Sequence, residues 1–244
     1  MIMNDLEKLK EVINNSKKIV VFSGAGLSTN SGIPDFRSAD GLYNQKTKIQ
    51  VPPEEIISHS FFMENTKYFY EFYFSKMVYL DAKPNLAHKY FAKLEKEGKV
   101  LAVVTQNIDN LHQMAGSKKV YELHGSIMRN YCMKCHKFYS LNDIYNKAFD
   151  IPKCSCGGII KPDVVLYEEG LDEKTIEGAI DAIMNADTLI VVGTSLTVYP
   201  AASFVRYFRG NNLVLLNKSH TQYDSYANIA IHDDVKNVIE YLEK

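Results

Sequence analysis

The sequence predicts an α/β fold built on a doubly wound parallel sheet, and three observations lead to this prediction. Short, unbroken apolar runs recur along the 244 residues, and each is too short to form a helix. Segments with apolar residues at helical spacing lie between these runs, as the connections between parallel strands require. Polar residues or glycines directly follow several runs, at the edge where such sheets bind ligands.

The apolar runs define the expected strands, and the periodic segments define the expected helices. We expect strands over residues 19–22, 101–105, 120–123, 164–167, 189–192 and 213–216. We expect helices over about 6–13, 86–97, 173–186, 201–208 and 234–242. Residues 38–53 are polar and contain two prolines, which predicts a loop, and residues 61–80 hold nine aromatic side chains. We expect most of these aromatics to pack a helical module against the main domain.

Composition excludes several classes of protein. With 28 basic and 29 acidic residues the net charge is −1, so nothing indicates a general affinity for nucleic acid. The first ten residues carry Asp5, Glu7, Lys8 and Lys10, which a signal peptide would not, and no apolar run approaches the ~20 residues that span a bilayer. We therefore expect a soluble, cytoplasmic protein that binds neither a membrane nor nucleic acid.

All four cysteines lie in one short segment. Cys132 and Cys135 form one pair, and after eighteen residues Cys154 and Cys156 form a second. Clustered pairs in a cytosolic chain are typical of a structural zinc ribbon, in which four thiolates close the coordination shell. The second pair is C-x-C where C-x-x-C is usual. A redox pair or incidental thiols is the alternative, and His136 is an alternative ligand.

A glycine-rich turn follows the first expected strand. Gly24, Ala25 and Gly26 allow a sharp turn and a close approach of the backbone, and amide groups at a strand-to-helix turn favour a pyrophosphate. Position 29 is Thr where the common G-x-G-x-x-G pattern has Gly. A tight turn without a ligand is the alternative reading, because a short glycine motif is a weak signal.

Polar side chains also follow the other expected strands. They are Gln106 to Asp109 after the second strand, His124 after the third, Gly193 to Ser195 after a later one, and Asn217 after the next. Each alone fits capping, turn chemistry or a structural histidine. Because the carboxyl ends of parallel strands share one edge, we expect them to meet in one crevice.

These motifs together resemble those of the sirtuins, the NAD-dependent protein lysine deacylases. The resembling stretches are Gly24-Ala25-Gly26 with Ser28, the run from Gly32 to Arg37, Thr105 to His112, His124-Gly125 and Gly193 to Leu196. The resemblance implies a Rossmann-like NAD-binding domain (1–42, 86–130 and 162–244). It also implies a smaller inserted domain, made of a helical module (43–85) and a zinc-ribbon module (131–161).

The resemblance further implies an activity and its co-substrate. The protein is expected to cleave NAD⁺ and move an acyl group from a protein lysine to the ADP-ribose. The products would be nicotinamide, the free lysine and the 2′-O-acylated ADP-ribose. The implied NAD contacts are Gly24, Ala25, Gly26, Thr29, Asp35, Phe36, Arg37, Gln106, Asn107, Ile108, Asp109, His124, Gly193, Thr194, Ser195, Asn217 and Asp234. One structural zinc ion is implied at the four cysteines.

Two residues are implied as catalytic. His124 would act as the general base that takes a proton from a ribose hydroxyl, a task that suits imidazole because its ordinary pKa is near 6.5. Asn107, with Gln106, would order the ribose hydroxyls and a water.

The acyl-lysine peptide is expected to add as a strand between residues 164–167 and 197–199, with Val165, Tyr167 and Val198 as contacts. The family usually has Phe-Gly-Glu where this chain has Tyr167-Glu168-Glu169, and the extra carboxylate suggests a preference for basic peptides. We expect a monomer.

Deacetylation is the expected reaction, and two alternatives use the same site. Family members that prefer acidic acyl groups carry a Tyr and an Arg on a helix of the small domain, where this chain has Tyr73 and Lys76. A mono-ADP-ribosyltransferase would use the same activated ribose. A Rossmann oxidoreductase fits poorly, because no suitable acidic residue follows the glycines by about 20 positions. A non-enzymatic zinc-ribbon module would leave the polar strand ends unexplained.

Overall fold

The computed structural model describes residues 2–36, 41, 42, 51–145 and 150–244. Its larger domain is a six-stranded, all-parallel sheet of order β3-β2-β1-β7-β8-β9. The strands are β1 (Ile19–Ser23), β2 (Val100–Thr105), β3 (Val120–Glu122), β7 (Thr188–Val192), β8 (Asn212–Leu216) and β9 (Ile229–Ile231). The order reverses between β1 and β7, which confirms the predicted doubly wound sheet and locates its switch point.

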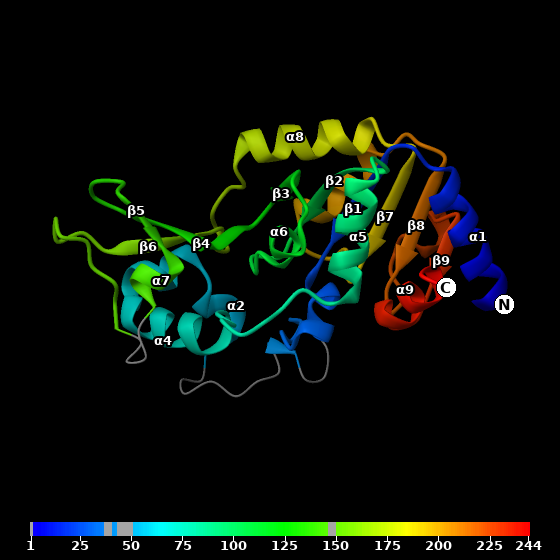
Figure 1. Cartoon of the computed structure of the whole chain (residues 1–244). Helices are drawn as coiled ribbons and strands as arrows, with labels where there is room; N and C mark the ends of the chain where they lie inside the picture. The colour runs from blue at the N-terminus through cyan, green and yellow to red at the C-terminus, as the bar shows by residue number, and fades with distance from the viewer. Residues whose placement is uncertain (1, 37–40, 43–50, 146–149) are drawn as a thin grey trace.

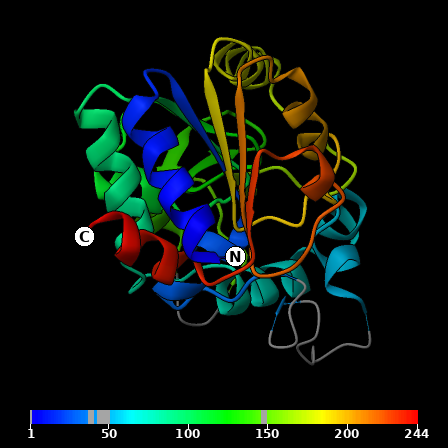
Figure 2. The same cartoon turned by 90° about the vertical axis from the view of Figure 1, so that its right-hand side faces the viewer.

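Helices cover both faces of this sheet (Figures 1 and 2). The helices α1 (Ile2–Asn15), α5 (Leu86–Lys96) and α9 (Val235–Leu242) pack on one face, through a core that includes Leu9, Phe91 and Ile239. The other face carries α8 (Glu173–Met184) and the 3₁₀ helix η4 (Ala201–Tyr207). Asp172 caps α8, because its carboxylate accepts from the Thr175 amide at 2.8 Å. No helix among the described residues is long and apolar enough to cross a membrane.

The smaller domain joins a second sheet to short helices. Strands β4 (Gly125–Cys132), β5 (Phe138–Ser140) and β6 (Ile160–Val164) form an antiparallel sheet of order β5-β4-β6. The helices packed on it are α2 (Pro53–Ile56), α3 (His59–Glu64), α4 (Thr66–Lys76) and α7 (Leu141–Ile144). Phe69, Tyr70 and Tyr73 are buried together in this core. The aromatic segment is therefore a packing element as predicted, but it packs mainly within the smaller domain and not against the main one.

One arginine ties the two sheets together. Arg129 of β4 contacts Glu122 of β3 at 2.6 Å and Asp163 of β6 at 2.7 Å. The first contact reaches the large sheet and the second stays in the small one. His124 lies in the two-residue connection between β3 and β4, beside this ion-pair cluster.

Several elements differ from expectation. The strand expected over 164–167 was wrong: β6 ends at Val164, and the chain then turns, with the Leu166 amide donating to Glu169 Oε2 at 2.9 Å. The segment expected to be a helix over 201–208 is a 3₁₀ helix, and the helix expected to reach residue 186 ends at Met184. Strands β4, β5, β6 and β9 and the short helix α6 (Leu111–Ala115) had no clear apolar run to predict them. Most of the expected loop over 38–53 lies outside the described residues.

Two histidines are buried against each other behind the sheet. His88 of α5 and His112 of α6 have ring centroids 4.9 Å apart, and His112 Nε2 lies 2.9 Å from the Ser23 hydroxyl. Burial lowers the pKa of His88 to about 4. Burial, and then the neighbouring His88, hold the pKa of His112 well below its usual value. Both rings are therefore neutral in the folded protein at neutral pH.

We predict that this pair makes the fold sensitive to acid. Below pH about 6.5 the histidines of the unfolded chain bind protons, whereas the buried rings of the folded protein stay neutral to lower pH. The free energy of unfolding therefore falls as pH decreases. Replacing His88 with Asn should reduce the loss of stability between pH 7.5 and 5.5 by about 1.4 kcal/mol. Urea unfolding at both pH values measures this, with exposed His59→Asn as the control. An unchanged pH dependence in H88N would contradict the prediction.

Candidate active site

The turns after β1 and β7 touch at the switch point of the sheet. The Gly24 amide donates to the Val192 carbonyl at 3.0 Å, and the Gly26 amide donates to the Gly193 carbonyl at 2.8 Å. A Cβ on Gly24 would lie 2.7 Å from Thr194 Cβ, and one on Gly193 would clash with the Leu27 backbone nitrogen. Gly193 also has a φ of +63°, which favours glycine. These glycines are required for the contact between the turns themselves.

Residues after β2 fasten the same crevice from the other side. Gln106 Nε2 donates to Thr194 Oγ1 at 3.0 Å. The buried Asn107 donates from Nδ2 to the Gly24 carbonyl and to Ser28 Oγ, each at 3.1 Å. The structure therefore brings together three segments that the sequence analysis placed in one crevice.

Asp109 is held by two donors. Its Oδ2 accepts from the Ser28 hydroxyl at 2.6 Å, and its Oδ1 accepts from the Leu111 amide at 2.9 Å. Burial raises the pKa of Asp109, and the bond from Ser28 opposes this only in part. Ile108, its neighbour, packs against the core of the smaller domain. Ser28 thus links Asn107 and Asp109. It was not among the predicted site residues, although it belongs to the Gly24–Ser28 motif that could have indicated it.

His124 is oriented by a single backbone bond. Its Nδ1 lies 2.9 Å from the Gln106 carbonyl oxygen, which can only accept, so Nδ1 carries the proton and Nε2 offers a lone pair in the neutral ring. Burial lowers the pKa of His124, and the bond to Gln106 offsets part of that shift. The ring is partly exposed at the carboxyl edge of the sheet, so Nε2 can act as a base.

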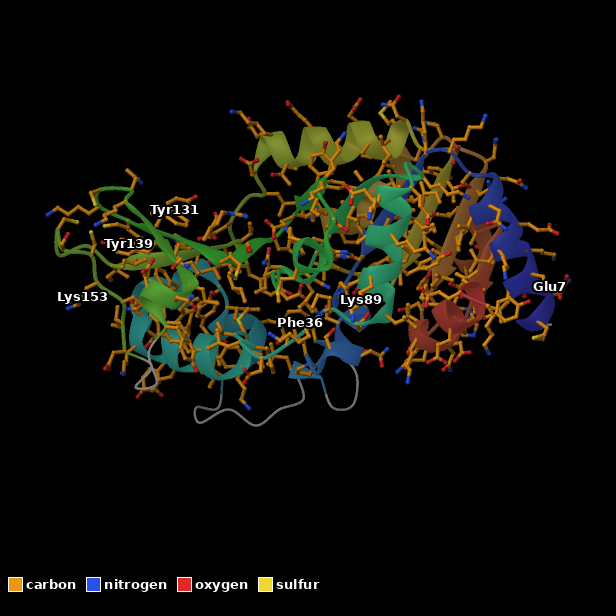
Figure 3. The ribbon with its side chains drawn as sticks, viewed as in Figure 1. Glu7, Phe36, Lys89, Tyr131, Tyr139 and Lys153 are labelled. Atoms are coloured by element: carbon orange, nitrogen blue, oxygen red, sulfur yellow. The ribbon has the colours of Figure 1, made fainter. Side chains whose placement is uncertain are left out.

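Three of the remaining predicted contacts are placed by local interactions. Asp234 caps α9 and pairs with Lys218 at 2.9 Å, and its other oxygen accepts from Asn30 at 2.7 Å. Asn217 follows β8 and donates to the Ser219 carbonyl at 2.8 Å. Phe36 packs against the smaller domain, on the side of the larger domain that faces it (Figure 3).

Four further predicted NAD contacts have local structural roles. Thr29 Oγ1 bonds back to the Gly26 carbonyl at 3.0 Å, and Ser195 Oγ lies 2.8 Å from Thr197 Oγ1. Ala25 begins the 3₁₀ helix η1 (Ala25–Leu27), and the Asp35 carbonyl accepts from the Leu42 amide at 2.7 Å. Arg37 lies outside the described residues.

The four cysteines converge at the far end of the smaller domain. The sulfur atoms of Cys132 and Cys156 are 3.5 Å apart, those of Cys135 and Cys154 3.6 Å, and all four lie within 4.8 Å of one another. None of them forms a disulfide. Tetrahedral Zn–S bonds of about 2.3 Å place sulfurs roughly 3.8 Å apart, so the cluster fits one structural zinc ion. The Cys156 amide and the Tyr139 hydroxyl lower the pKa of Cys154 to about 5, which favours the thiolate that a metal binds.

The segment expected to bind peptide is fixed on one side. The Val165 amide donates to the His124 carbonyl at 3.0 Å, and the Tyr167 amide donates to the Ile57 carbonyl at 3.0 Å. Val198 lies in the loop before η4, where its carbonyl accepts from the Ala202 amide at 2.9 Å. Val165 therefore adjoins the proposed base directly through the backbone.

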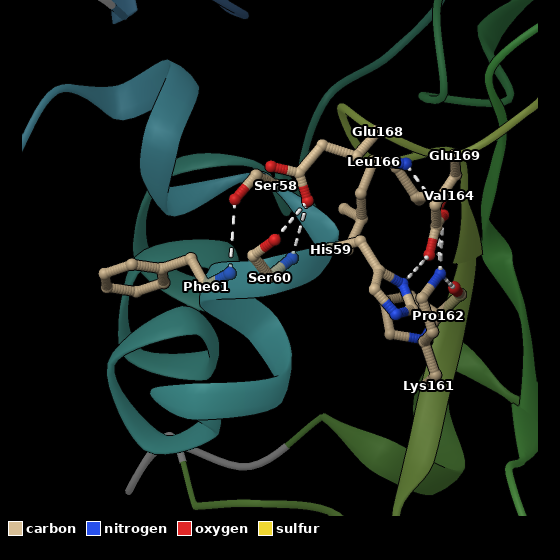
Figure 4. A network of polar contacts seen from close by, with 10 residues as sticks. All are labelled: Ser58, His59, Ser60, Phe61, Lys161, Pro162, Val164, Leu166, Glu168 and Glu169. Atoms are coloured by element: carbon tan, nitrogen blue, oxygen red, sulfur yellow. Dashed lines mark hydrogen bonds and ion pairs between the residues drawn. The ribbon is translucent and has the colours of Figure 1, made fainter.

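Glu168 stands where the family usually has glycine, and its backbone is left-handed. Its φ is +75°, in the left-handed region. Its carboxylate accepts from the Ser60 amide at 2.8 Å and from the Ser60 hydroxyl at 2.5 Å, near the start of α3 (Figure 4). Glu169 meanwhile contacts His59 at 2.9 Å and Lys161 at 3.1 Å. This network holds the turn in place despite the missing glycine.

Comparison with known proteins agrees with this geometry. The sequence profile of the Sir2 family matches residues 24–200. The chain belongs to the Sir2 family. This confirms the resemblance to sirtuins drawn from the motifs.

Relatives and solved structures match along nearly the whole chain. It is 59% identical to an "NAD-dependent protein deacetylase" of Clostridium perfringens over 96% of both chains. It is 56% identical to one of Clostridium acetobutylicum over 98% of both. A solved Sir2 complex with a p53 peptide and NAD⁺ is 39% identical, with a TM-score of 0.84 over 96% of this chain and 95% of the other. A histidine-to-alanine Sir2 variant with deacetylated p53 peptide and 3′-O-acetyl-ADP-ribose is 38% identical, with a TM-score of 0.89 over 97% and 96%.

We predict that Gly193→Ala disrupts the crevice. The left-handed conformation alone costs about 1–2 kcal/mol for alanine, and the new methyl group forces the two turns apart. Thermal unfolding should therefore show a lower Tm and a smaller upward shift on adding NAD⁺. Gly170→Ala is the matched control, because its Cβ meets open space and should leave both readings near wild type. Equal behaviour of the two variants would contradict the prediction.

Proposed function

We propose that this Sir2-family protein is an NAD-dependent protein deacetylase that forms nicotinamide, 2′-O-acetyl-ADP-ribose and an unmodified lysine. The named relatives and the NAD- and peptide-bound structures support the activity. The observation that carries the proposal is the neutral His124 beside the Asn107–Gly24 contact, at the switch point of the sheet. A base and a polar cradle meet there, where a dinucleotide binds in such folds.

The donor set suits the co-substrate. We assign the phosphates and nearby ribose to Gly24, Gly26, Thr194 and Ser195, and the adenosine end to Asn217 and Asp234. Asp109, whose pKa burial raises, would contact the nicotinamide carboxamide. NAD⁺ supplies the ribose carbon that gives up nicotinamide and accepts the acyl oxygen.

The chain's own residues then position groups and move one proton. His124 accepts a proton at Nε2 from a ribose hydroxyl, while its Nδ1 stays bonded to the Gln106 carbonyl. Asn107 cannot turn freely, because its amide already bonds Gly24 and Ser28, so its remaining oxygen can order a hydroxyl or a water. Phe36 shields the ribose face after nicotinamide leaves.

The deciding experiment is mass spectrometry of an acetyl-lysine peptide incubated with the protein, with and without NAD⁺. We expect the peptide to lose about 42 Da only when NAD⁺ is present, because a hydrogen replaces its acetyl group. ADP-ribose should gain the same mass. Transfer of labelled ADP-ribose onto protein without peptide deacetylation would favour the ADP-ribosyltransferase instead. Matched succinyl- and malonyl-lysine peptides test the acidic acyl alternative.

The acetyl group is favoured by the surroundings of Tyr73. Its ring is fully buried and stacks on Phe69 at 5.7 Å, and its hydroxyl has no hydrogen-bond partner among the described residues. Because this tyrosine is wholly enclosed in the helical core, a carboxylate on an acyl chain would have to displace that packing to reach its hydroxyl.

We predict that His124→Ala keeps the fold and loses deacetylation. A general base contributes typically 10²–10⁴-fold, so kcat/KM should fall by about that factor while the Tm stays near wild type. Because the pKa of His124 is lowered, the wild-type protein should keep its activity below pH 6.5, with the acid limb of the profile at a lower pH. An acid limb above 6.5, or full turnover by H124A, would contradict the assignment.

The substrates are acyl-lysine peptides, and we infer a preference for basic flanking residues. Glu55, Glu64 and Glu168 line one groove beside Tyr167, and none of the described residues lining it is basic. Bonds from the Ser60 hydroxyl and amide lower the pKa of Glu168, so its carboxylate stays charged at neutral pH.

We predict that an acetyl-lysine peptide with flanking arginines has a lower KM than one with flanking glutamates. Glu168→Gln keeps an acceptor for Ser60 but removes the charge, so it should narrow the difference in KM between the two peptides. Exposed attractions of this kind are weak, so we expect that difference to be roughly 1.5- to 5-fold in the wild type. Glu240→Gln on α9 is the matched control. Equal KM values for both peptides in the wild type would refute the preference.

We place the protein in the cytoplasm and propose that it is a monomer. Four unpaired cysteines that fit a metal suit a reducing compartment, where thiols are not driven into disulfides. Light scattering on the purified protein tests the oligomeric state.

A further inference from the structure

A second cluster of metal-ligating side chains lies outside the crevice and far from the cysteines in the sequence. His220 and Asp224 belong to the segment after β8, and His232 directly follows β9. One ligand atom from each lies within 4.8 Å of the other two. The side chain of His220 is 84% exposed, and those of Asp224 and His232 are 20% and 25% exposed. An ion from solution can therefore reach all three.

The three side chains meet at one carboxylate oxygen. Asp224 Oδ2 lies 2.7 Å from His220 Nδ1 and 3.1 Å from His232 Nε2. The other oxygen, Oδ1, accepts from the Thr221 amide at 3.0 Å and from its hydroxyl at 2.8 Å. Those two bonds fix the orientation of the carboxylate, as partners behind a metal ligand commonly do.

The contacts of the two His232 ring nitrogens indicate that a proton or a cation lies between this ring and Asp224. Its Nδ1 lies 3.1 Å from the Asn217 carbonyl oxygen, which only accepts, so Nδ1 carries a hydrogen. In the neutral ring Nε2 then has a lone pair, and that lone pair faces the acceptor oxygen of Asp224. Two acceptors at 3.1 Å repel each other unless a proton or a cation lies between them.

The cluster matches the requirements of a transition-metal ion. Two imidazoles and one carboxylate are ligands that Zn²⁺, Ni²⁺ and Fe²⁺ bind, and three protein ligands leave room for water. Bonds of about 2.0–2.1 Å in tetrahedral geometry place ligand atoms roughly 3.4 Å apart. The 3.1 Å between His232 Nε2 and Asp224 Oδ2 is close to that separation. His220 Nδ1 is nearer, at 2.7 Å, but its side chain is exposed and has room to move outward. The backbone bond at His232 Nδ1 is the usual arrangement behind a metal-binding histidine.

We propose that His220, Asp224 and His232 form a second metal site, which binds one divalent transition-metal ion of the zinc class. The ion ties the segment after β8 to the end of β9, next to Asn217.

The test is a zinc titration of tag-free protein that already carries one zinc ion per chain at its cysteines. Isothermal titration calorimetry should show one further equivalent of Zn²⁺. Absence of a second equivalent would overturn the proposal.

Variants decide which residues hold the ion. His220→Ala changes an exposed position, and Asp224→Asn changes the side chain little in size. Each should weaken binding of the second ion by roughly 10–100-fold or more, since removing even a residue that only supports a ligand lowers metal affinity by that factor. His59→Ala is the matched control: it removes another exposed histidine paired with a carboxylate, at 2.9 Å, which has no third ligand beside it among the described residues. Retention of the cysteine-bound zinc confirms that each variant is folded. Wild-type affinity in H220A or D224N would also overturn the proposal.

Discussion

The contact between the turns after β1 and β7 is the constraint on which the rest of the site depends. Gly26 and Gly193 meet backbone to backbone, which only residues without a Cβ allow at this distance. Once the turns are fixed, the Gly24 carbonyl is placed to accept from Asn107, and Thr194 to accept from Gln106. The polar residues that follow β2 are thereby held against the turns after β1 and β7.

Burial then sets the charge of the groups gathered there. It raises the pKa of Asp109 and lowers that of His124, so each shift favours the neutral form. The buried polar groups of the crevice bond to one another: Ser28 links Asn107 with Asp109, and Ser23 links Thr105 with His112. Such a crevice accepts a dinucleotide without a cluster of fixed charges to desolvate.

The sequence predicted the larger domain and its polar strand ends well, because unbroken apolar runs and motif spacing record them directly. It predicted the smaller sheet poorly. Strand β4 includes Ser126, Arg129 and Asn130, and its register with β6 is irregular. Its apolar residues therefore show neither the alternation typical of a strand nor the spacing typical of a helix. The sequence shows Glu168 where the family usually has glycine, but it does not show that Ser60, distant in sequence, supports the left-handed backbone there. His220, Asp224 and His232 form no motif in the sequence, since a turn and a strand bring them together.

The position of His124 between the two sheets has a consequence for how the protein can move. Only two residues separate β3, in the large sheet, from β4, in the small one, and His124 is one of them. Arg129 bridges the same junction through Glu122 and Asp163. This connection is one of several between the domains, so a rotation of one domain against the other bends the chain beside the imidazole. The two contacts of Arg129 oppose that bend and so help to hold the base in place.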